Sequence, residues 1–149
     1  MNFGIHEQNM VRNALGAAVL KSYDSHENFY IKIRQSSLIR SMSILRSDSN
    51  LRFSSLVDCF AVDFLAKSKV FSIYYQMLSY QLNQSLFVSI DLNENDILPS
   101  LTILFQNANW YEREIFDMFG IVFHDHPDMR RILTNHDFSS FPLLKNFLL

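Results

Sequence analysis

The chain has 149 residues, of which 48% are hydrophobic and 14% aromatic, and its formal net charge at pH 7 is −2. This composition is typical of a folded protein rather than a disordered one, and the length predicts a single domain. The charge balance argues against a nucleic-acid partner, and no apolar run approaches the ~20 residues that a membrane helix requires.

Cys59 is the only cysteine, so the sequence offers neither an internal disulfide nor a cysteine cluster for zinc or iron–sulfur binding. It lies in the apolar run "LVDCFAVDF", which predicts a small buried side chain. Residues 1–13 lack the apolar core of a secretory signal, so we expect a soluble chain that either stays where it is made or uses a cryptic signal.

The first half of the chain predicts one strand and one helix. Residues 29–34 alternate apolar and polar side chains, as a half-buried strand does. Residues 36–46 place apolar side chains at helical spacing, with Ser36 or Ser37 available as the N-cap. Four arginines recur every six residues, a period that fits neither a helical nor a strand face, so we expect solvated charges. They are Arg34, Arg40, Arg46 and Arg52.

Three further segments predict strands. Residues 54–64 are mixed: their front could finish a helix, whereas residues 60–64 favour a strand. Residues 70–80 are rich in β-branched and aromatic side chains, and residues 84–93 alternate clearly. The intervening residues 81–84 predict a hairpin turn.

Pro99 suits the first turn of a helix over residues 99–108. The order of elements predicts an α+β fold with a mostly antiparallel or mixed sheet, helices packed on one face, and short helices at the C-terminal end. Within a single domain over residues 1–149, we expect a sheet-rich part over about 1–98 and a helical part over about 99–149.

The segment "NWYEREIFDMFGIVFHDHPDMRRIL" concentrates charged side chains among large apolar ones. Asn109 is a suitable N-cap, Glu112 can complete a capping box, and Gly120 can end the helix in a left-handed conformation. Arg113 and Asp117 are spaced for an i,i+4 ion pair. The apolar stripe of this helix comprises Tyr111, Ile115, Met118 and Phe119.

After this helix, residues 120–125 predict a short extended piece, and Pro127 predicts the start of a second short helix. Asp128 would lie in its first turn, and Arg130 and Arg131 in its last turn, which complements the helix dipole.

The same charges raise the question of chemistry. Glu112 and Glu114 point about 200° apart on a helix, so they do not form a pair of acids in one pocket. A small metal-dependent enzyme is one hypothesis, but no H-E-x-x-H motif is present. Its ligands would be His124, His126, Asp128 and Glu114. The alternatives are a protein interface anchored by aromatic and arginine side chains, and a solvated pair of amphipathic helices.

The pattern W-Y-E-R-E-x-F-D-M-F-G-I-x-F-x-x-H-P-D-x-R-R-I-L-T resembles the signature of one family. This is the small hydrophilic quinone-module subunit of respiratory complex I (NADH:ubiquinone oxidoreductase), called NADH dehydrogenase subunit nine in mitochondria and the C subunit in bacteria. The resemblance is dense over residues 107–138, looser upstream, and only general over residues 1–50.

The resemblance implies a non-catalytic subunit in the peripheral arm that supports electron transfer from NADH to ubiquinone as a scaffold. We therefore expect no catalytic, cofactor-binding or metal-binding residue in this chain: FMN, iron–sulfur clusters and ubiquinone would lie in partner subunits. The expected partners are the hydrogenase-like large subunit and nearby iron–sulfur subunits.

The segment "WYEREIFDMFG" is most similar to mitochondrial and proteobacterial members of the family. The residue usage also favours amino acids with AT-rich codons, as an organelle genome would. Together they predict an organelle-encoded chain on the matrix side of the mitochondrial inner membrane. A plastid or bacterial counterpart, or the related subunit of a membrane-bound hydrogenase, is the alternative within this resemblance.

The resemblance also implies a set of fold-defining and interface residues. They are Trp110, Glu112, Arg113, Glu114, Asp117, Met118, Phe119, Gly120, His126, Pro127, Asp128, Arg130, Arg131 and Leu133. We expect the charged ones to form buried or rim ion pairs.

The sequence departs from the family pattern over residues 141–149, which are "FPLLKNFLL" where the family usually has "HPLRKDFPL". Phe141 stands for His, Leu144 for Arg, Asn146 for Asp and Leu148 for Pro. The more apolar terminus is consistent with burial beneath a neighbouring subunit. Family members usually continue into a tail along the partner, so the contacts of that tail are left open.

Overall fold

The computed structural model of the chain describes residues 3–26, 28–64 and 70–145. The chain forms two compact units: unit 1 comprises Met1–Asp58 and Tyr74–Ile90, and unit 2 comprises Cys59–Ile73 and Asp91–Leu149. Neither unit is one continuous segment, unlike the expected parts on either side of residue 98. The single-domain expectation stays a prediction.

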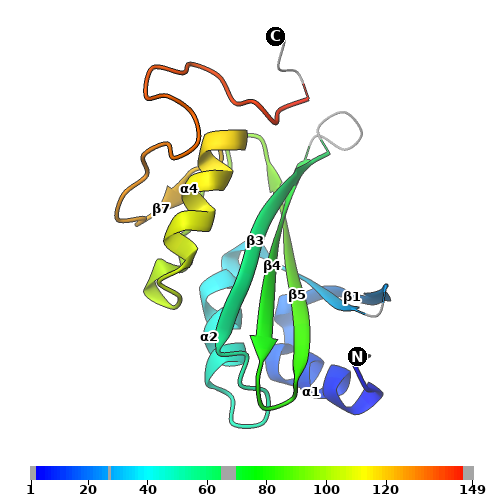
Figure 1. The fold of residues 1–149 in the computed structure, drawn as a ribbon. Helices are drawn as coiled ribbons and strands as arrows, with labels where there is room; N and C mark the ends of the chain where they lie inside the picture. The colour runs from blue at the N-terminus through cyan, green and yellow to red at the C-terminus, as the bar shows by residue number, and fades with distance from the viewer. Residues whose placement is uncertain (1–2, 27, 65–69, 146–149) are drawn as a thin grey trace. The chain divides into compact units, whose positions relative to one another are not determined.

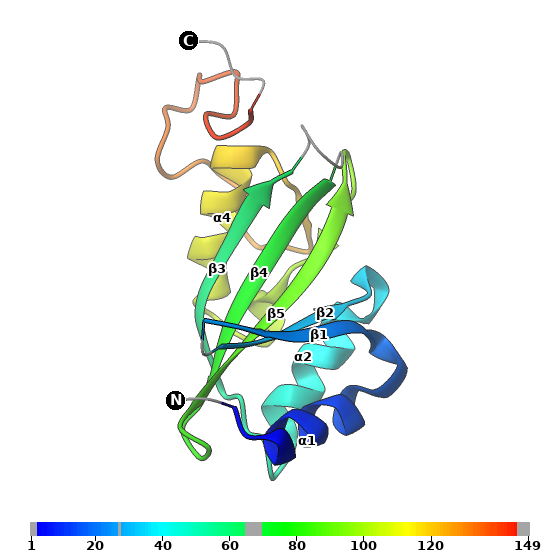
Figure 2. The same ribbon diagram turned by 90° about the vertical axis from the view of Figure 1, so that its right-hand side faces the viewer.

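The sheet has five strands in the order β1-β2-β5-β4-β3 (Figures 1 and 2). β1 pairs with β2 antiparallel, and β2 pairs with β5 parallel, so the sheet is mixed and the predicted α+β class is confirmed. The strands are β1 (Val19–Ser25), β2 (Asn28–Ile33), β3 (Ser55–Asp63), β4 (Val70–Ser79) and β5 (Gln84–Asn93).

The strands predicted near residues 29, 70 and 84 are confirmed. The alternative that the front of residues 54–64 finishes a helix is wrong, because β3 is extended from Ser55 and joins the sheet as its last strand. The predicted hairpin turn is confirmed at residues 80–83. Its last residue, Asn83, has a φ of 52°, a left-handed conformation that asparagine tolerates better than most residues.

Unit 1 packs two helices, α1 (Ile5–Leu15) and α2 (Leu38–Ser47), which lie side by side (Figure 2). The alternation of β2 buries Phe29, Ile31 and Ile33, and the helices add apolar side chains to this core. The helical contribution comprises Val11, Leu15, Leu38, Met42 and Leu45.

Each helix of unit 1 is followed or preceded by a 3₁₀ turn: η1 (Gly16–Ala18) follows α1, and η2 (Gln35–Ser37) precedes α2. The helix predicted over residues 36–46 is confirmed, but the predicted serine cap is not. Ser37 has φ −100° and ψ 1°, which is not the extended conformation of a capping residue, and its side chain makes no cap hydrogen bond.

Unit 2 contains the helix α4 (Ala108–Phe119) and a short parallel pair, β6 (Leu98–Pro99) with β7 (Phe123–His124) (Figure 1). The predicted extended piece after Gly120 is confirmed by β7. The helix predicted over residues 99–108 is wrong: only the 3₁₀ turn η3 (Leu101–Ile103) forms there.

Pro99 fits β6 for a physical reason. The neighbouring amides make the bonds of this pair: Leu98 donates to the Val122 carbonyl at 3.2 Å and Ser100 to the His124 carbonyl at 2.8 Å. The position between them needs no donor, so proline is tolerated there as it is at a sheet edge.

The helix predicted before Gly120 is confirmed, and Gly120 ends it in the left-handed conformation at φ 77°. The second helix predicted from Pro127 is wrong, because residues 125–145 form irregular structure. None of the helices that the described residues form combines the length and hydropathy needed to cross a membrane.

Candidate functional site

The charged segment is organised around Asp117, which is completely buried on α4. Its Oδ2 atom accepts hydrogen bonds from the amides of Ile132, Leu133 and Thr134, at 3.1, 2.7 and 2.9 Å. Its Oδ1 atom accepts from the Thr134 hydroxyl at 2.5 Å and from Arg131 Nη1 at 2.7 Å. The carboxylate thus satisfies three consecutive amides of residues 132–134 outside any helix or strand.

Arg131 links this carboxylate to the surrounding loop. Its guanidinium also donates to the Asp117 carbonyl at 3.2 Å and to the Ser140 carbonyl at 3.1 Å. Three aromatic rings surround it, with centroids 5.0 to 6.0 Å from Cζ. They belong to Phe116, Phe138 and Phe141. A planar cation held between rings and carbonyls is a rigid structural contact.

The surroundings of Asp117 favour its charged form. Burial alone would raise its pKa, but the hydrogen bonds from Thr134, Leu133 and Arg131 outweigh burial and hold the pKa well below the ordinary value. The predicted i,i+4 pair between Arg113 and Asp117 is wrong, because Asp117 pairs with Arg131 instead. Arg113 Nε donates to the Arg130 carbonyl at 2.9 Å.

Glu112 forms a second buried centre one turn earlier on α4. Its Oε2 accepts from the Ser100 hydroxyl at 2.6 Å and its Oε1 from the Leu101 amide at 2.7 Å. The predicted capping box is therefore wrong: Asn107 precedes the helix, and Glu112 satisfies the start of η3 rather than the start of its own helix.

His126 lies next to this carboxylate, with Nε2 3.8 Å from Glu112 Oε2 and both side chains completely buried. Its Nδ1 accepts from the Asp128 amide at 3.0 Å, which places the proton of the neutral ring on Nε2, 3.2 Å from the Asn109 carbonyl. Burial raises the pKa of Glu112 to about 7, although the bonds from Ser100 and Leu101 oppose that rise.

Other predicted residues lie on the surface of unit 2. Trp110 is 62% exposed, with the Arg113 guanidinium 5.1 Å from its ring centroid. Asp128 and Arg130 form an exposed ion pair at 2.6 Å. Exposed side chains without a structural role of this kind are Glu114, Pro127 and Leu133.

The remaining three predicted residues hold the C-terminal end of α4. The Met118 carbonyl accepts from the Leu143 amide at 3.0 Å, and the Phe119 ring meets the Phe71 ring edge-on at 6.3 Å. At Gly120, an added Cβ would lie 2.6 Å from the Phe141 ring. Phe141, which departs from the family pattern, is thus a packing residue, while Asn146 and Leu148 lie outside the described residues.

The proposed metal ligands do not converge. His124 Nδ1 lies 2.7 Å from Asp125 at the surface, and both nitrogens of His126 are occupied by backbone groups. Across residues 3–26, 28–64 and 70–145, no group of three or more His, Cys, Asp or Glu side chains could hold a metal ion.

Ser100 and Thr134 were not among the predicted residues, and Phe141 was noted only as a departure from the family pattern. Ser100 caps η3, because its side chain accepts a hydrogen bond from the Thr102 amide at 3.1 Å. A sequence signal existed here, since serine is a preferred residue at the start of a helical turn. Thr134 binds Asp117, and Phe141 packs against Gly120, from positions well after α4 in the sequence. A local sequence pattern cannot predict such contacts.

The chain matches one family of known proteins. Residues 31–149 match the family described as "Respiratory-chain NADH dehydrogenase, 30 Kd subunit". The C subunit of the NADH-quinone oxidoreductase of Ruegeria pomeroyi is 46% identical over 78% of this chain and 58% of its own length. NADH-ubiquinone oxidoreductase subunit 9 of Reclinomonas americana is 38% identical over 95% of this chain and 73% of its own length.

The chain thus spans 58% to 73% of the length of these two relatives. Among solved structures, a chain of the membrane-bound sulfane sulfur reductase, an archaeal respiratory membrane complex, aligns with a TM-score of 0.82 at 18% identity. The alignment covers 97% of this chain and 86% of that one. This similarity concerns the fold.

Proposed function

Because this chain belongs to the family of the respiratory-chain NADH dehydrogenase 30 kDa subunit, we propose that it is a non-catalytic subunit in the peripheral arm of complex I. In this role it supports electron transfer from NADH to quinone by holding neighbouring subunits in place. It contributes no group to the chemistry itself.

The observation that carries this proposal is the enclosure of the two buried acids of α4. Glu112 and Asp117 have no exposed surface, and groups of the same unit occupy their oxygen atoms. A general acid or base must reach a proton on its substrate, within about 2.6–3.2 Å or through one water molecule. These carboxylates instead bind one part of unit 2 to another.

The exposed members of the signature supply the contact surface. Trp110 and Arg113 stack on each other at the surface of α4, and tryptophan and arginine are enriched among the residues that dominate protein interfaces. The partner we propose is the hydrogenase-like large subunit of the quinone module, together with nearby iron–sulfur subunits, as the family resemblance implies.

We assign FMN, the iron–sulfur clusters and ubiquinone to those partners. Cysteine thiolates are the usual ligands of iron–sulfur clusters, and Cys59 is the single cysteine of this sequence and is buried. The location we propose is the matrix side of the mitochondrial inner membrane. Its support is the AT-biased residue usage, together with the likeness to the Reclinomonas americana subunit.

The test is co-migration of the tagged chain with NADH dehydrogenase activity. Membranes of the source organism are solubilised, separated on a native gel, stained for NADH oxidation and analysed by mass spectrometry across the lane. We expect the chain in the large, active band of mitochondrial membranes. Recovery of the chain only as a free monomer would contradict the proposal, and recovery from plastid or bacterial membranes would correct its location.

A further inference from the structure

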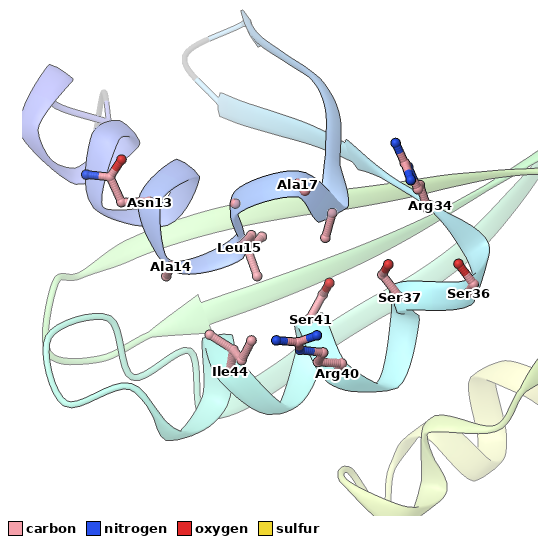
Figure 3. A pocket seen from close by; sticks show the side chains of 12 residues that line it. Asn13, Ala14, Leu15, Ala17, Arg34, Ser36, Ser37, Arg40, Ser41 and Ile44 are labelled. Atoms are coloured by element: carbon pink, nitrogen blue, oxygen red, sulfur yellow. The ribbon is translucent and has the colours of Figure 1, made fainter.

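A cavity of about 390 Å³ lies within unit 1, between the η1 turn and the beginning of α2 (Figure 3). It is far from the signature segment in sequence, and the proposed scaffold role does not use it. Cavities of this size accommodate small ligands or parts of larger ones.

The lining of this cavity is positively charged and rich in hydroxyl groups. It contains two arginines, several serines and no acidic residue. The side chains that matter here are Arg34, Arg40, Ser36, Ser37 and Ser41. Both arginines are exposed, and within the described part of the chain neither forms an ion pair. Their charge is therefore available to a ligand.

Ser41 provides the observation that points to a ligand. The residue is 1% exposed, and its hydroxyl has no hydrogen-bond partner among the described residues. In Figure 3 this hydroxyl points from α2 into the space below Ala17. Buried hydroxyl groups are nearly always paired, so an unpaired one at a cavity wall indicates that something else completes it.

The backbone adds a second favourable contribution. η2 leads directly into α2, a helix of 10 residues, and no side chain caps either element. The positive end of the helix dipole therefore meets the cavity, which is the arrangement that binds phosphate groups in many proteins. On the opposite wall, Gly16 leaves open space where a side chain would stand.

We propose that this cavity binds a phosphate group, carried either by a soluble phosphate ester or by a lipid headgroup. Ser41 donates its hydroxyl hydrogen to a phosphate oxygen, Ser36 and Ser37 lie beside it at the start of the helix, and Arg40 and Arg34 close over the anion from two sides. The cavity volume leaves room for part of the molecule that carries the phosphate.

The experiment is an NMR titration of the full chain with inorganic phosphate, with sodium chloride holding the ionic strength constant. We expect saturable shifts of the Ser36, Ser37 and Ser41 amide signals. Arg40→Gln should weaken binding about tenfold or more, since it removes a charged hydrogen-bond donor. Arg52→Gln removes an equal charge from an exposed position outside the cavity and should leave binding unchanged.

Ser41→Ala separates a ligand contact from a structural one. Its hydroxyl has no partner among the residues that the structure describes, so the variant should fold as the parent does and bind phosphate several-fold more weakly. Absence of saturation in the parent would overturn the proposal. So would equal losses in Arg40→Gln and Arg52→Gln, or undiminished binding in both Arg40→Gln and Ser41→Ala. Arg40 is exposed, so its variant keeps the test decisive even if Ser41→Ala misfolds.

A second arm identifies the source of the phosphate. The chain is sedimented with phosphatidylcholine vesicles that contain or lack phosphatidic acid, with inorganic phosphate as competitor. Co-sedimentation that requires phosphatidic acid and is weakened by Arg40→Gln supports a lipid headgroup. Saturable binding of inorganic phosphate without co-sedimentation supports a soluble phosphate ester.

Discussion

Asp117 and Glu112 lie on the same helix and are both buried, yet their surroundings shift their pKa values in opposite directions. Asp117 receives five hydrogen bonds from three amides, a hydroxyl and a guanidinium, which outweigh the effect of burial. Glu112 receives two, from Ser100 and Leu101, and burial prevails. The number of donors decides which of two buried acids stays charged.

At Asp117, we predict that Asp117→Asn lowers the free energy of unfolding by about 3–5 kcal/mol, because the largely buried Arg131 loses its charged partner. Urea unfolding of the full chain measures the change. Asp128→Asn is the matched control: it breaks the exposed pair with Arg130 and should change the unfolding midpoint very little. Similar losses in both variants would contradict the importance of burial.

At Glu112, we predict a stability that depends on pH. The folded state raises the pKa from 4.5 to about 7. The stability associated with this group is therefore full below about pH 4.5 and is lost as the pH rises through about 7. The loss is on the order of 3 kcal/mol.

Glu112→Gln tests this dependence, since glutamine retains an uncharged side chain of the same shape at every pH. Unfolding followed between pH 5 and pH 8 should show a smaller decline in this variant than in the parent chain. Glu114→Gln, at an exposed position two residues along α4, should decline as the parent does. A parent chain whose stability does not fall over this range would refute the raised pKa.

At the scale of elements, α4 illustrates how far the sequence can be interpreted. Its end at Gly120 was predictable because a left-handed glycine is a local signal, and strand β5 was predictable because its side chains alternate. The structure around Pro99 was not predictable, because proline suits both the first turn of a helix and a strand position that needs no amide donor.

The irregular segment after β7 could not be predicted for a different reason. Its conformation depends on a carboxylate 14 to 17 positions earlier in the chain, and the helix signals at Pro127 and Asp128 are overridden by that contact. The burial of Glu112 was also beyond a helical-wheel argument, because η3 covers a side chain that the apolar stripe leaves outside. The sequence therefore indicated a segment rich in charged and aromatic side chains, but not how these side chains pair.

Gly120 gives a prediction for this junction. Gly120→Ala should lower the free energy of unfolding by about 1–2 kcal/mol, because alanine is disfavoured in the left-handed region. Its Cβ would also lie 2.6 Å from the Phe141 ring. The cost should shrink to about 1 kcal/mol in a Phe141→Ala background, where only the backbone part remains. If Gly120→Ala lowered the free energy of unfolding equally in both backgrounds, the Phe141 ring would be shown to move aside without cost.

At the scale of the whole molecule, strands β3, β4 and β5 each contribute residues to both compact units. Both units contain paired aromatic rings, and unit 2 also carries a tryptophan that is largely exposed. In unit 1, Tyr30 stacks on Tyr23 and Phe87 at 5.2 and 4.7 Å. In unit 2, Trp110 is largely exposed with Arg113 over its ring, as a residue that anchors a partner would be.

We predict that Trp110→Ala reduces the fraction of the chain found in the large complex without changing the stability of the free chain. Loss of an interface anchor costs about 2 kcal/mol or more of binding, whereas a 62% exposed side chain adds little to folding. Quantitative mass spectrometry of the native-gel band measures assembly. Tyr80→Ala, at a 72% exposed turn outside the signature, should assemble normally.

The position of the Asp117 donors has a consequence for biosynthesis. They follow it by 14 to 17 residues, so a ribosome releases α4 before the residues that complete it. A nascent chain at that stage carries a helix whose inner side holds an unsatisfied charge. Unit 2 can therefore complete its folding only after Thr134 has been translated. A premature stop codon just before Arg131 would give a product that lacks the donors for Asp117, and we expect quality-control proteases to degrade it.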